Sequence, residues 1–449
     1  MDWTKLMSHK RLGGALDDAD DARTPDLRDM DRILFSSAFR RLQDKTQVFP
    51  LPLSDYVRTR LTHSIEASCV GRSLGAIVGK EVVSRHKLSS LLTPTNFGIT
   101  VGVACLAHDI GNPPFGHSGE DAIQHWFKTS DVAKALLSRM TSHEKSDLLN
   151  FEGNAQGFRI LSRLQNADAR GGLQLTCSTL GAFTKYPREA AIPYDKGLSA
   201  GASMKKHGFF QREVDLFQEV ADTLGLLKRT ECPKSWARHP LAFLVEAADD
   251  ICYRIIDFED GFRLGHVTYS DAEDRLLAII GGEAKATRLS RIHQPQDKVA
   301  YLRSKAINRL TRESAEVFLE NEAAILAGSY DEPLVSKIEH SAELEEIKKL
   351  SKERVYSVQE VVEVEAAGFE VICGLLEYFV SAATDFAENG KDASAMSRKY
   401  LQLLPERYRK SEQDPYKRIL RITDYISGMT DSFAVSLYRK FTGISIPGT

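Results

Sequence analysis

Residues 98–109 restrict the fold strongly, because a helix over this segment would be apolar on nearly every face. The segment runs as Gly-Ile-Thr-Val-Gly-Val-Ala-Cys-Leu-Ala into His108 and Asp109, and the sequence Gly111-Asn112-Pro113-Pro114 ends it. A helix without a polar face belongs in the centre of a large core. The chain has 449 residues, of which 42% are hydrophobic, so it can bury such a core.

Helical periodicity continues along most of the chain, whereas alternating strand patterns are short. Thr24-Pro25-Asp26 combines a cap residue, a first-turn proline and an early acid, which predicts a helix that stops near Pro50. Further helices are expected over about residues 59–83 and 241–259. The Gly-, Thr- and Ser-rich segment 171–210 predicts loops or a small hairpin.

We therefore predict an all-α protein. A charged stretch near residues 283–300 is the best candidate for a boundary, which divides the chain into a core over 1–282 and a C-terminal helical region over 283–449. The two parts are expected to form one compact unit.

Composition excludes several classes of protein. The net charge is -3, so any contact with nucleic acid or polyphosphate has to come from local clusters of Lys and Arg. The six cysteines show no CxxC spacing, which speaks against a zinc knot or a redox centre. We find no signal-peptide pattern and no run of about 18 apolar residues. A soluble, cytoplasmic enzyme without membrane insertion is expected.

His108 and Asp109 stand where the apolar helix meets its stop sequence. A helix C-terminus carries partial negative charge and unpaired carbonyl groups, so an imidazole and a carboxylate there favour a cation. The simpler interpretation is a polar cap at a helix end. The dipeptide is common, and it does not decide between the two by itself.

His63 and Asp249 add weight to the metal interpretation, because each lies in an otherwise apolar helix. A carboxylate in such surroundings must be protonated, paired or bound to metal. Two imidazoles and two carboxylates without a thiolate suit manganese, magnesium, cobalt, nickel or iron better than a structural zinc ion. Asp250 is the competing ligand, and an ion pair of Asp249 with an arginine is the structural alternative.

Two helices extend this candidate site. Asp249, Tyr253 and Asp257 are spaced i, i+4 and i+8, so they form one polar stripe that is expected to line a pocket rather than face solvent. Arg60 lies one turn before His63 on the same face, where its guanidinium could clamp phosphate oxygens. An ordinary surface arginine is the alternative.

After the prolines, the sequence FGHSGED predicts a second helix start next to the metal site. Ser118 is expected to cap it, with Asp121 as the partner in a capping box. His117 would then point into the gap, and Glu120 would orient its imidazole as expected for a general acid or base. A histidine that only packs at a helix start is the alternative.

Together these residues resemble the HD superfamily, in which His, His-Asp and a distant Asp surround a divalent metal ion. Several blocks are, in order, similar to bacterial dGTP triphosphohydrolases: RRLQDKTQVF (40–49), RTRLTHS (58–64), HDIGNPPFGHSGE (108–120), FEGNAQGFRIL (151–161), HPLAFLVEAADDICY (239–253) and DYISGMTD (424–431). The resemblance implies hydrolysis of a deoxynucleoside triphosphate at its α-phosphorus, giving deoxynucleoside and tripolyphosphate.

The resemblance also assigns roles to individual residues. The metal ligands would be His63, His108, Asp109 and Asp249, and the catalytic pair would be His117 and Glu120. Arg60 would contact the α-phosphate. The other expected substrate contacts are Lys185, Tyr186, Lys206 and Tyr253 at the triphosphate, Gln47 and Asp257 at the sugar, and Asn112, Asn154 and Arg421 shaping the pocket. For Lys206, ordinary loop charge is a serious rival, because Lys205 adjoins it.

The resemblance further implies a homo-oligomer, commonly a hexamer, in which the C-terminal helices of neighbouring chains complete the pocket. Single-stranded DNA is compatible with such an enzyme, but no basic-aromatic stretch predicts that it binds. The rival functions are another HD phosphohydrolase, such as a phosphodiesterase or a 5′-nucleotidase, and a nucleotide-sensing or DNA-binding regulatory protein. The strictness of a guanine preference stays open, because base recognition lies in less patterned segments.

Overall fold

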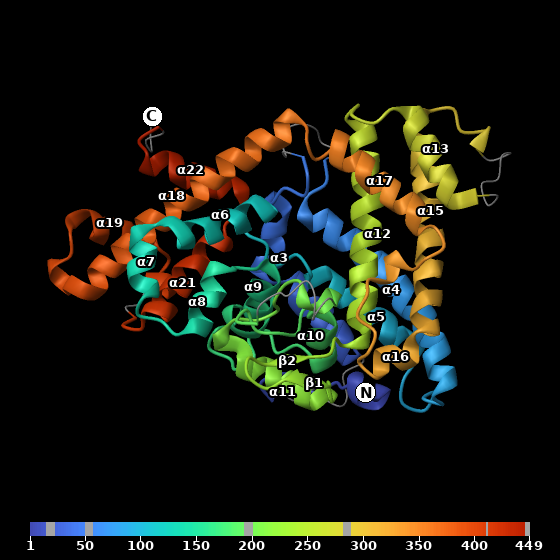
Figure 1. Cartoon of the computed structure of the whole chain (residues 1–449), viewed down its shortest axis with the longest axis horizontal. Helices are drawn as coiled ribbons and strands as arrows, with labels where there is room; N and C mark the ends of the chain where they lie inside the picture. The colour runs from blue at the N-terminus through green and yellow to red at the C-terminus, as the bar shows by residue number, and fades with distance from the viewer. Residues whose placement is uncertain (15–22, 50–56, 193–200, 282–288, 410–411, 445–449) are drawn as a thin grey trace.

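Helices dominate the computed structural model (Figure 1), which describes residues 1–14, 23–49, 57–192, 201–281, 289–409 and 412–444. The strands in these residues are β1 (Lys228–Thr230) and β2 (Ser235–Trp236), which form an antiparallel pair. The predicted all-α fold is confirmed.

The first half of the chain supplies the helices around the apolar segment. They are α1 (Trp3–Leu6), α2 (Pro25–Leu34), α3 (Ser37–Arg41), α4 (Arg60–Arg85), α5 (Pro94–Ala107), α6 (Gly116–Thr129), α7 (Asp131–Leu137), α8 (Ser142–Leu149), α9 (Gly153–Arg159), α10 (Cys177–Phe183) and α11 (Val214–Leu224). A π-helical turn, Ile160–Leu164, continues α9.

The second half adds longer helices. They are α12 (Pro240–Arg263), α13 (Tyr269–Ile280), α15 (Pro295–Glu320), α16 (Glu322–Leu326), α17 (Ser341–Arg354), α18 (Gln359–Asn389), α19 (Ala395–Leu403), α20 (Glu406–Arg409), α21 (Pro415–Ser427) and α22 (Asp431–Phe441). Short 3₁₀ turns lie at Leu42–Asp44, Ala202–Met204, Gln211–Glu213, Leu334–Ser336 and Gly390–Asp392.

Helix α5 lies at the centre of the larger core, as its composition predicted. Every residue from Phe97 to Ala107 is buried, and α5 packs against α4, α2, α10 and α12. Helix α4 approaches α5 closely at Gly75, where an added Cβ would lie 2.6 Å from the Phe97 carbonyl oxygen. Nearer the C-terminal end of α5, an added Cβ at Gly71 would lie 2.5 Å from the Cys105 Sγ atom and 3.5 Å from the Ala248 Cβ atom, so α4, α5 and α12 pack closely there as well.

A second core joins α6–α8 to the C-terminal helices α18, α21 and α22, which gather on one side of the molecule (Figure 1). Helix α18 contains an 18-residue window of mean hydropathy 1.4, long and apolar enough to cross a membrane by length and composition. Length and composition alone are weak evidence for a membrane span, because a buried core helix passes the same test. Half of that window is buried in the protein, where α18 packs on α6, α19, α21 and α22.

Several predicted boundaries need correction. Thr24 caps α2, as expected, but the helix ends at Leu34, because Ser36 breaks the helix and caps α3. The segment 171–210 contains the buried helix α10, and the hairpin lies later, at β1 and β2. The predicted boundary between residues 282 and 283 lies outside the described residues.

Candidate active site

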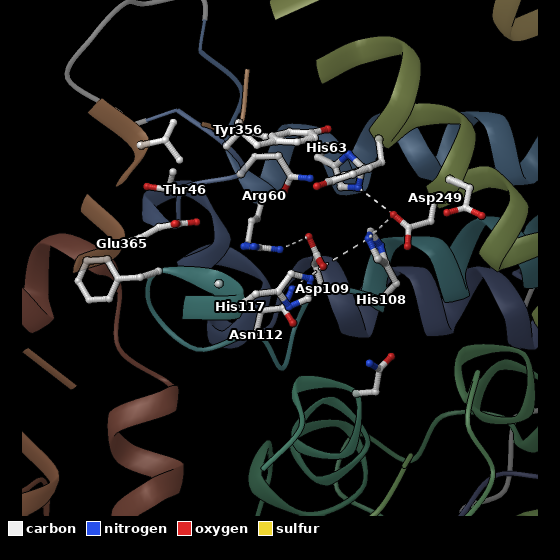
Figure 2. Close-up of a pocket in the computed structure, with 18 of the residues that line it drawn as sticks. Thr46, Arg60, His63, His108, Asp109, Asn112, His117, Asp249, Tyr356 and Glu365 are labelled. Carbon is white, nitrogen blue, oxygen red and sulfur yellow. Dashed lines mark hydrogen bonds and ion pairs between the residues drawn. The ribbon is translucent and has the colours of Figure 1, made fainter. Parts of the chain in front are cut away.

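The N-terminal end of α4, the C-terminal end of α5 and the middle of α12 meet at a cavity of about 640 Å³ (Figure 2). Most of the residues that the sequence singled out line it. They are Gln47, Arg60, His63, His108, Asp109, Asn112, His117, Asn154, Lys185, Tyr186, Lys206, Asp249 and Tyr253. A cavity of this size falls in the range of small-molecule sites.

Local helix geometry positions the first of these side chains. Thr59 caps α4 through a reciprocal capping box with Thr62, so α4 begins at Arg60. Arg60 and His63 then lie on the same face, one turn apart, at the end of the helix that borders the cavity. His108 is the C-cap residue of α5, which explains why it and Asp109 emerge from the core at the same place.

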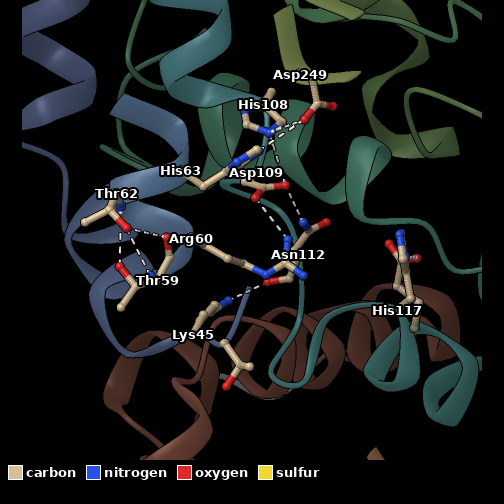
Figure 3. Close-up of polar contacts among 12 residues, drawn as sticks. Lys45, Thr59, Arg60, Thr62, His63, His108, Asp109, Asn112, His117 and Asp249 are labelled. Atoms are coloured by element: carbon tan, nitrogen blue, oxygen red, sulfur yellow. Dashed lines mark hydrogen bonds and ion pairs between the residues drawn. The ribbon is translucent and has the colours of Figure 1, made fainter. Parts of the chain in front are cut away.

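His63, His108 and Asp249 point toward one another (Figure 3). The Asp249 Oδ1 atom lies 3.1 Å from His63 Nε2 and 3.3 Å from His108 Nε2. His108 Nδ1 lies 2.6 Å from the Cys105 carbonyl oxygen, which can only accept, so this nitrogen donates. In the neutral imidazole, Nε2 would then carry the lone pair that a metal ligand needs. The donor set suits a divalent cation.

Asp109 lies beside this group. Its Oδ1 atom is 3.5 Å from His108 Nε2, and its Oδ2 atom accepts a hydrogen bond of 2.9 Å from Arg60. Burial alone would raise the pKa of Asp109, but His108 and Arg60 outweigh burial and lower it to about 2. Lys185 and His108 likewise hold the pKa of the partly buried Asp249 well below its ordinary value. Both carboxylates are therefore ionised, as metal ligands must be.

Asp249 and Asp250 occupy different positions, although both line the cavity. Asp249 contacts both imidazoles, whereas Asp250 belongs to no group of converging ligand atoms among the described residues. Burial raises the pKa of Asp250 to about 6. The geometry therefore favours Asp249 as the ligand.

Arg60 is buried and directs its guanidinium along the metal group toward the turn before α6. Its Nε atom has no hydrogen-bond partner in the described structure. Gly116 makes room for it, because an added Cβ there would lie 2.4 Å from the Arg60 Nη2 atom, and its φ of +57° is itself a conformation that favours glycine. The Arg60 guanidinium can thus face both the Asp109 carboxylate and a ligand in the cavity.

His117 and Glu120 interact as predicted. His117 Nδ1 lies 2.9 Å from Glu120 Oε2, and the Gly153 amide donates to the other oxygen of Glu120 at 2.7 Å. Glu120 raises the pKa of His117, mainly through this hydrogen bond. The predicted cap at Ser118 is wrong, because α6 begins earlier, after Phe115 in a left-handed conformation, and Ser118 donates to the Glu365 carbonyl oxygen instead.

Lys185 and Lys206 also line the cavity. Lys185 donates to Asp249 Oδ2 at 2.6 Å, and Lys206 donates to Glu152 at 2.9 Å. Lys205, the neighbour that made Lys206 ambiguous in the sequence, is exposed and does not line the cavity. Tyr186 lies beside the two lysines in the cavity wall.

The residues predicted near the sugar divide into two groups. Gln47 lines the cavity with a buried Oε1 atom that has no hydrogen-bond partner in the described structure. Asp257 is buried behind the wall, where it accepts a hydrogen bond of 3.1 Å from Tyr356, and Tyr356 in turn stacks on Tyr253. Asp257 therefore does not line the cavity itself, but it contacts Tyr356, which does.

Asn112 and Asn154 both line the cavity. Asn112 donates to Asp109 at 2.6 Å, and Asn154 donates to Glu152 at 2.8 Å. Arg421 does not line this cavity; it lies on α21 beside a separate small cavity, 3.6 Å from Glu412. The predicted part of Arg421 in shaping the pocket is therefore not seen in this chain.

The sequence missed one side of the cavity. It is formed mainly by residues of α17, α18 and the segment between them, namely Lys348, Lys352, Tyr356, Val361, Val364 and Glu365, and elsewhere by Thr46, Val48, Phe115 and Gly116. The α17 and α18 residues belong to amphipathic helices. In such a helix a polar side chain does not stand out, as Asp249 does in the otherwise apolar α12. No local signal separates them from an ordinary helix surface.

Comparisons with known proteins identify two segments. Residues 60–159, which carry His63, His108 and Asp109, match the HD domain. Residues 335–440, which supply α17, α18 and the C-terminal helices, match the phosphohydrolase-associated domain.

Similar proteins match along almost the whole chain. A deoxyguanosinetriphosphate triphosphohydrolase-like protein of Synechocystis is 47% identical over 99% of this chain and 100% of its own length. A protein of the same name from Pseudomonas aeruginosa is 40% identical over the full length of both. A deoxyguanosinetriphosphate triphosphohydrolase of Salmonella arizonae is 32% identical over 93% of each chain. The chain therefore belongs to the deoxyguanosinetriphosphate triphosphohydrolase-like family of HD-domain phosphohydrolases, as its sequence blocks predicted.

Proposed function

We propose that this phosphohydrolase cleaves deoxynucleoside triphosphates, with dGTP as the expected substrate, at the α-phosphorus. The observation that carries the proposal is the position of His63, His108, Asp109 and Asp249 at one wall of a cavity that also holds Arg60, Lys185 and Lys206. The two histidines and two aspartates suit a cation, and the three basic side chains suit the phosphates of a tetra-anionic ligand.

The two imidazoles and two ionised carboxylates fit a divalent metal ion, whose ligands we propose to be His63, His108, Asp109 and Asp249. When bound, the ion would supply positive charge and Lewis acidity at the α-phosphate. Manganese, magnesium, cobalt and nickel all suit this donor set. Arg60, held by Asp109, would contact an α-phosphate oxygen, and Lys185 and Lys206 would bind the remaining phosphates.

In the proposed reaction, a water oxygen forms a bond to the α-phosphorus and releases a proton to bulk water, while the bond from this phosphorus to the 5′ oxygen breaks. Tripolyphosphate and a deoxynucleoside are released. His117 is exposed at the cavity and has a raised pKa, so we infer that its protonated form gives a proton to the departing 5′ oxygen. Glu120 holds the imidazole through Nδ1, which leaves Nε2 to meet the substrate.

We assign the sugar to the wall formed by Gln47 and Tyr356. The buried Oε1 atom of Gln47 is an unsatisfied acceptor, and the 3′-hydroxyl of a deoxynucleotide is a donor that would satisfy it. Tyr356, fixed from behind by Asp257, closes the same side of the cavity. Close packing of this wall against the sugar would crowd a ribose 2′-hydroxyl.

Product identification tests the function. The purified protein is incubated with each of the four deoxynucleoside triphosphates, dGMP and a cyclic dinucleotide, each in the presence of manganese, magnesium, cobalt or nickel. We expect tripolyphosphate and deoxyguanosine from dGTP. Pyrophosphate or orthophosphate as the product, or turnover of dGMP or the cyclic dinucleotide alone, would instead support a 5′-nucleotidase, a phosphodiesterase or another hydrolase.

The interaction of Glu120 with His117 predicts a shift in the pH profile. Because the Glu120 carboxylate raises the pKa of His117, the protonated imidazole persists to higher pH in the wild-type protein. Glu120→Gln removes the charge and keeps a hydrogen-bond acceptor, so His117 should lose its proton at lower pH. The alkaline limb of the kcat profile should therefore move to lower pH. An unmoved limb, or one moved to higher pH, would contradict the role as an acid.

A further inference from the structure

The sequence block Asp424–Asp431 has no role in the proposed reaction, yet it lies against the turn that separates the metal group from His117. Helix α21 ends at Ser427 and α22 begins at Asp431. Asp431 contacts the segment Asn112–Phe115, which joins the end of α5 to the start of α6 and is called the catalytic turn below. Ser427 and Asp431 also contact Lys45 and Thr46, which precede α4 in the chain.

Asp431 holds one end of this catalytic turn. Its side chain is buried, and its Oδ1 atom accepts a hydrogen bond of 3.0 Å from the Phe115 amide. Its Oδ2 atom accepts one of 2.9 Å from the Thr46 amide. Phe115 has a φ of +62°, which is uncommon for a bulky residue and needs support from the surrounding structure.

Lys45 holds the other end. Its ammonium group is buried and donates to the Asn112 carbonyl oxygen, and also to the Ser427 carbonyl oxygen at 3.0 Å. Burial, reinforced by Arg41, lowers the pKa of Lys45 to about 7 although Asp431 acts in the opposite direction. A cation in such a desolvated place is costly unless its hydrogen bonds are made. Figure 3 shows Lys45 beneath the Asn112 turn.

A simpler explanation for Asp431 is that it stabilises the start of α22. The geometry speaks against this explanation, because Thr430 is the N-cap residue and its side chain accepts the Phe433 amide. Both oxygens of Asp431 are instead used by segments far away in the sequence. The carboxylate therefore serves the catalytic turn rather than its own helix.

The contacts made by Lys45 and Asp431 affect both the metal group and the pair formed by His117 and Glu120. Asn112, whose carbonyl oxygen Lys45 holds, donates its side-chain amide to Asp109 Oδ1 at 2.6 Å. Phe115 directly precedes α6, which carries His117 and Glu120. Fixing both ends of the turn therefore fixes Asp109 relative to His117.

We propose that Asp431 and Lys45 form a clamp through which the C-terminal helices position the proton-donating pair against the metal group. This inference rests on the proposed function. Asp431 and Lys45 are positioning residues, because they act through the backbone of Asn112–Phe115. Through Asp431, the clamp gives the phosphohydrolase-associated region a positioning part in catalysis within one chain.

Asp431→Asn tests the clamp with almost no change in side-chain volume. An amide has only one accepting atom, so either Phe115 or Thr46 must lose its acceptor. We expect kcat to fall by about 100-fold, the effect of displacing a catalytic group by about 1 Å, while KM changes by less than about threefold. Metal content should stay at the wild-type level. Amide hydrogen exchange should become faster in peptides that cover Asn112–Glu120.

Two further variants complete the experiment. Lys45→Met removes the donor and keeps an aliphatic chain, so it should reproduce the loss of kcat and the faster exchange. Asp414→Asn, a matched change of the N-cap carboxylate at the start of α21, should leave kcat and the exchange of this turn unchanged.

The clamp would be refuted if Asp431→Asn keeps the wild-type kcat. It would also be refuted if a loss of kcat comes with unchanged exchange at Asn112–Glu120. A wild-type protein that releases no tripolyphosphate would overturn the proposed function alone. The exchange measurement still decides on the clamp in that case, because it requires no turnover.

Discussion

Asp249→Ala is expected to abolish metal binding and, with it, hydrolysis. Asp249 contacts both His63 and His108, so its removal leaves two imidazoles and the adjacent Asp109 without the central carboxylate. Loss of an outer-shell partner already weakens metal binding by about 10- to 100-fold, and loss of a ligand should cost more than about 100-fold. Elemental analysis of the purified variant, and titration with manganese, would measure the effect.

Asp250→Asn is the matched control, since Asp250 is the next residue on α12 and is the only other acidic side chain that competed with Asp249 in the sequence. This variant should keep its metal. Normal metal content in Asp249→Ala together with metal loss in Asp250→Asn would reverse the assignment. The same loss in both variants would indicate damage to α12 rather than removal of a ligand.

His117→Ala is expected to lose turnover and keep metal. Its imidazole contacts Glu120 and no member of the metal group, so substitution should remove proton transfer while the ligands stay in place. General acid–base catalysis contributes about 10²- to 10⁴-fold, and kcat should fall by that factor. The measurements are kcat with dGTP and metal content on the same preparation.

His125→Ala is the control for this variant, because His125 is an exposed histidine farther along α6 that contacts Phe369 outside the cavity. It should retain wild-type kcat. Unchanged turnover in His117→Ala would refute the assigned role. Loss of metal from that variant would show that His117 supports the metal group instead.

The sequence predicted the helices that carry the metal group within a few residues. Thr24 and Pro25 are local signals for the start of α2, and the apolar composition of residues 98–107 fixes the central place of α5. The prediction failed where two local signals competed. Ser36 divides one expected helix into α2 and α3, and the left-handed Phe115 moves the start of α6 ahead of Ser118.

The remaining features depended on contacts between distant segments. The side of the cavity that contains Tyr356, Lys348 and Lys352 comes from α17 and the segment that follows it. The stripe of Asp249 and Tyr253 predicted that Asp257 lines the pocket, and the family resemblance implied a sugar contact, yet Tyr356 covers it. Helical spacing predicts which residues share a face, but not which neighbouring side chain will cover that face.

The sequence by itself determined the all-α class, the family and the identity of the polar residues in apolar helices, because cap residues, helical periodicity and ordered sequence blocks are local properties of the chain. Only the tertiary structure decided that Asp249 rather than Asp250 faces His63 and His108, and that Asp431 holds Phe115 from 316 residues away. The physical reason is that a hydrogen bond or a shared ligand depends on distance and direction between atoms. Those quantities are set when the helices pack, and no pattern along the chain contains them.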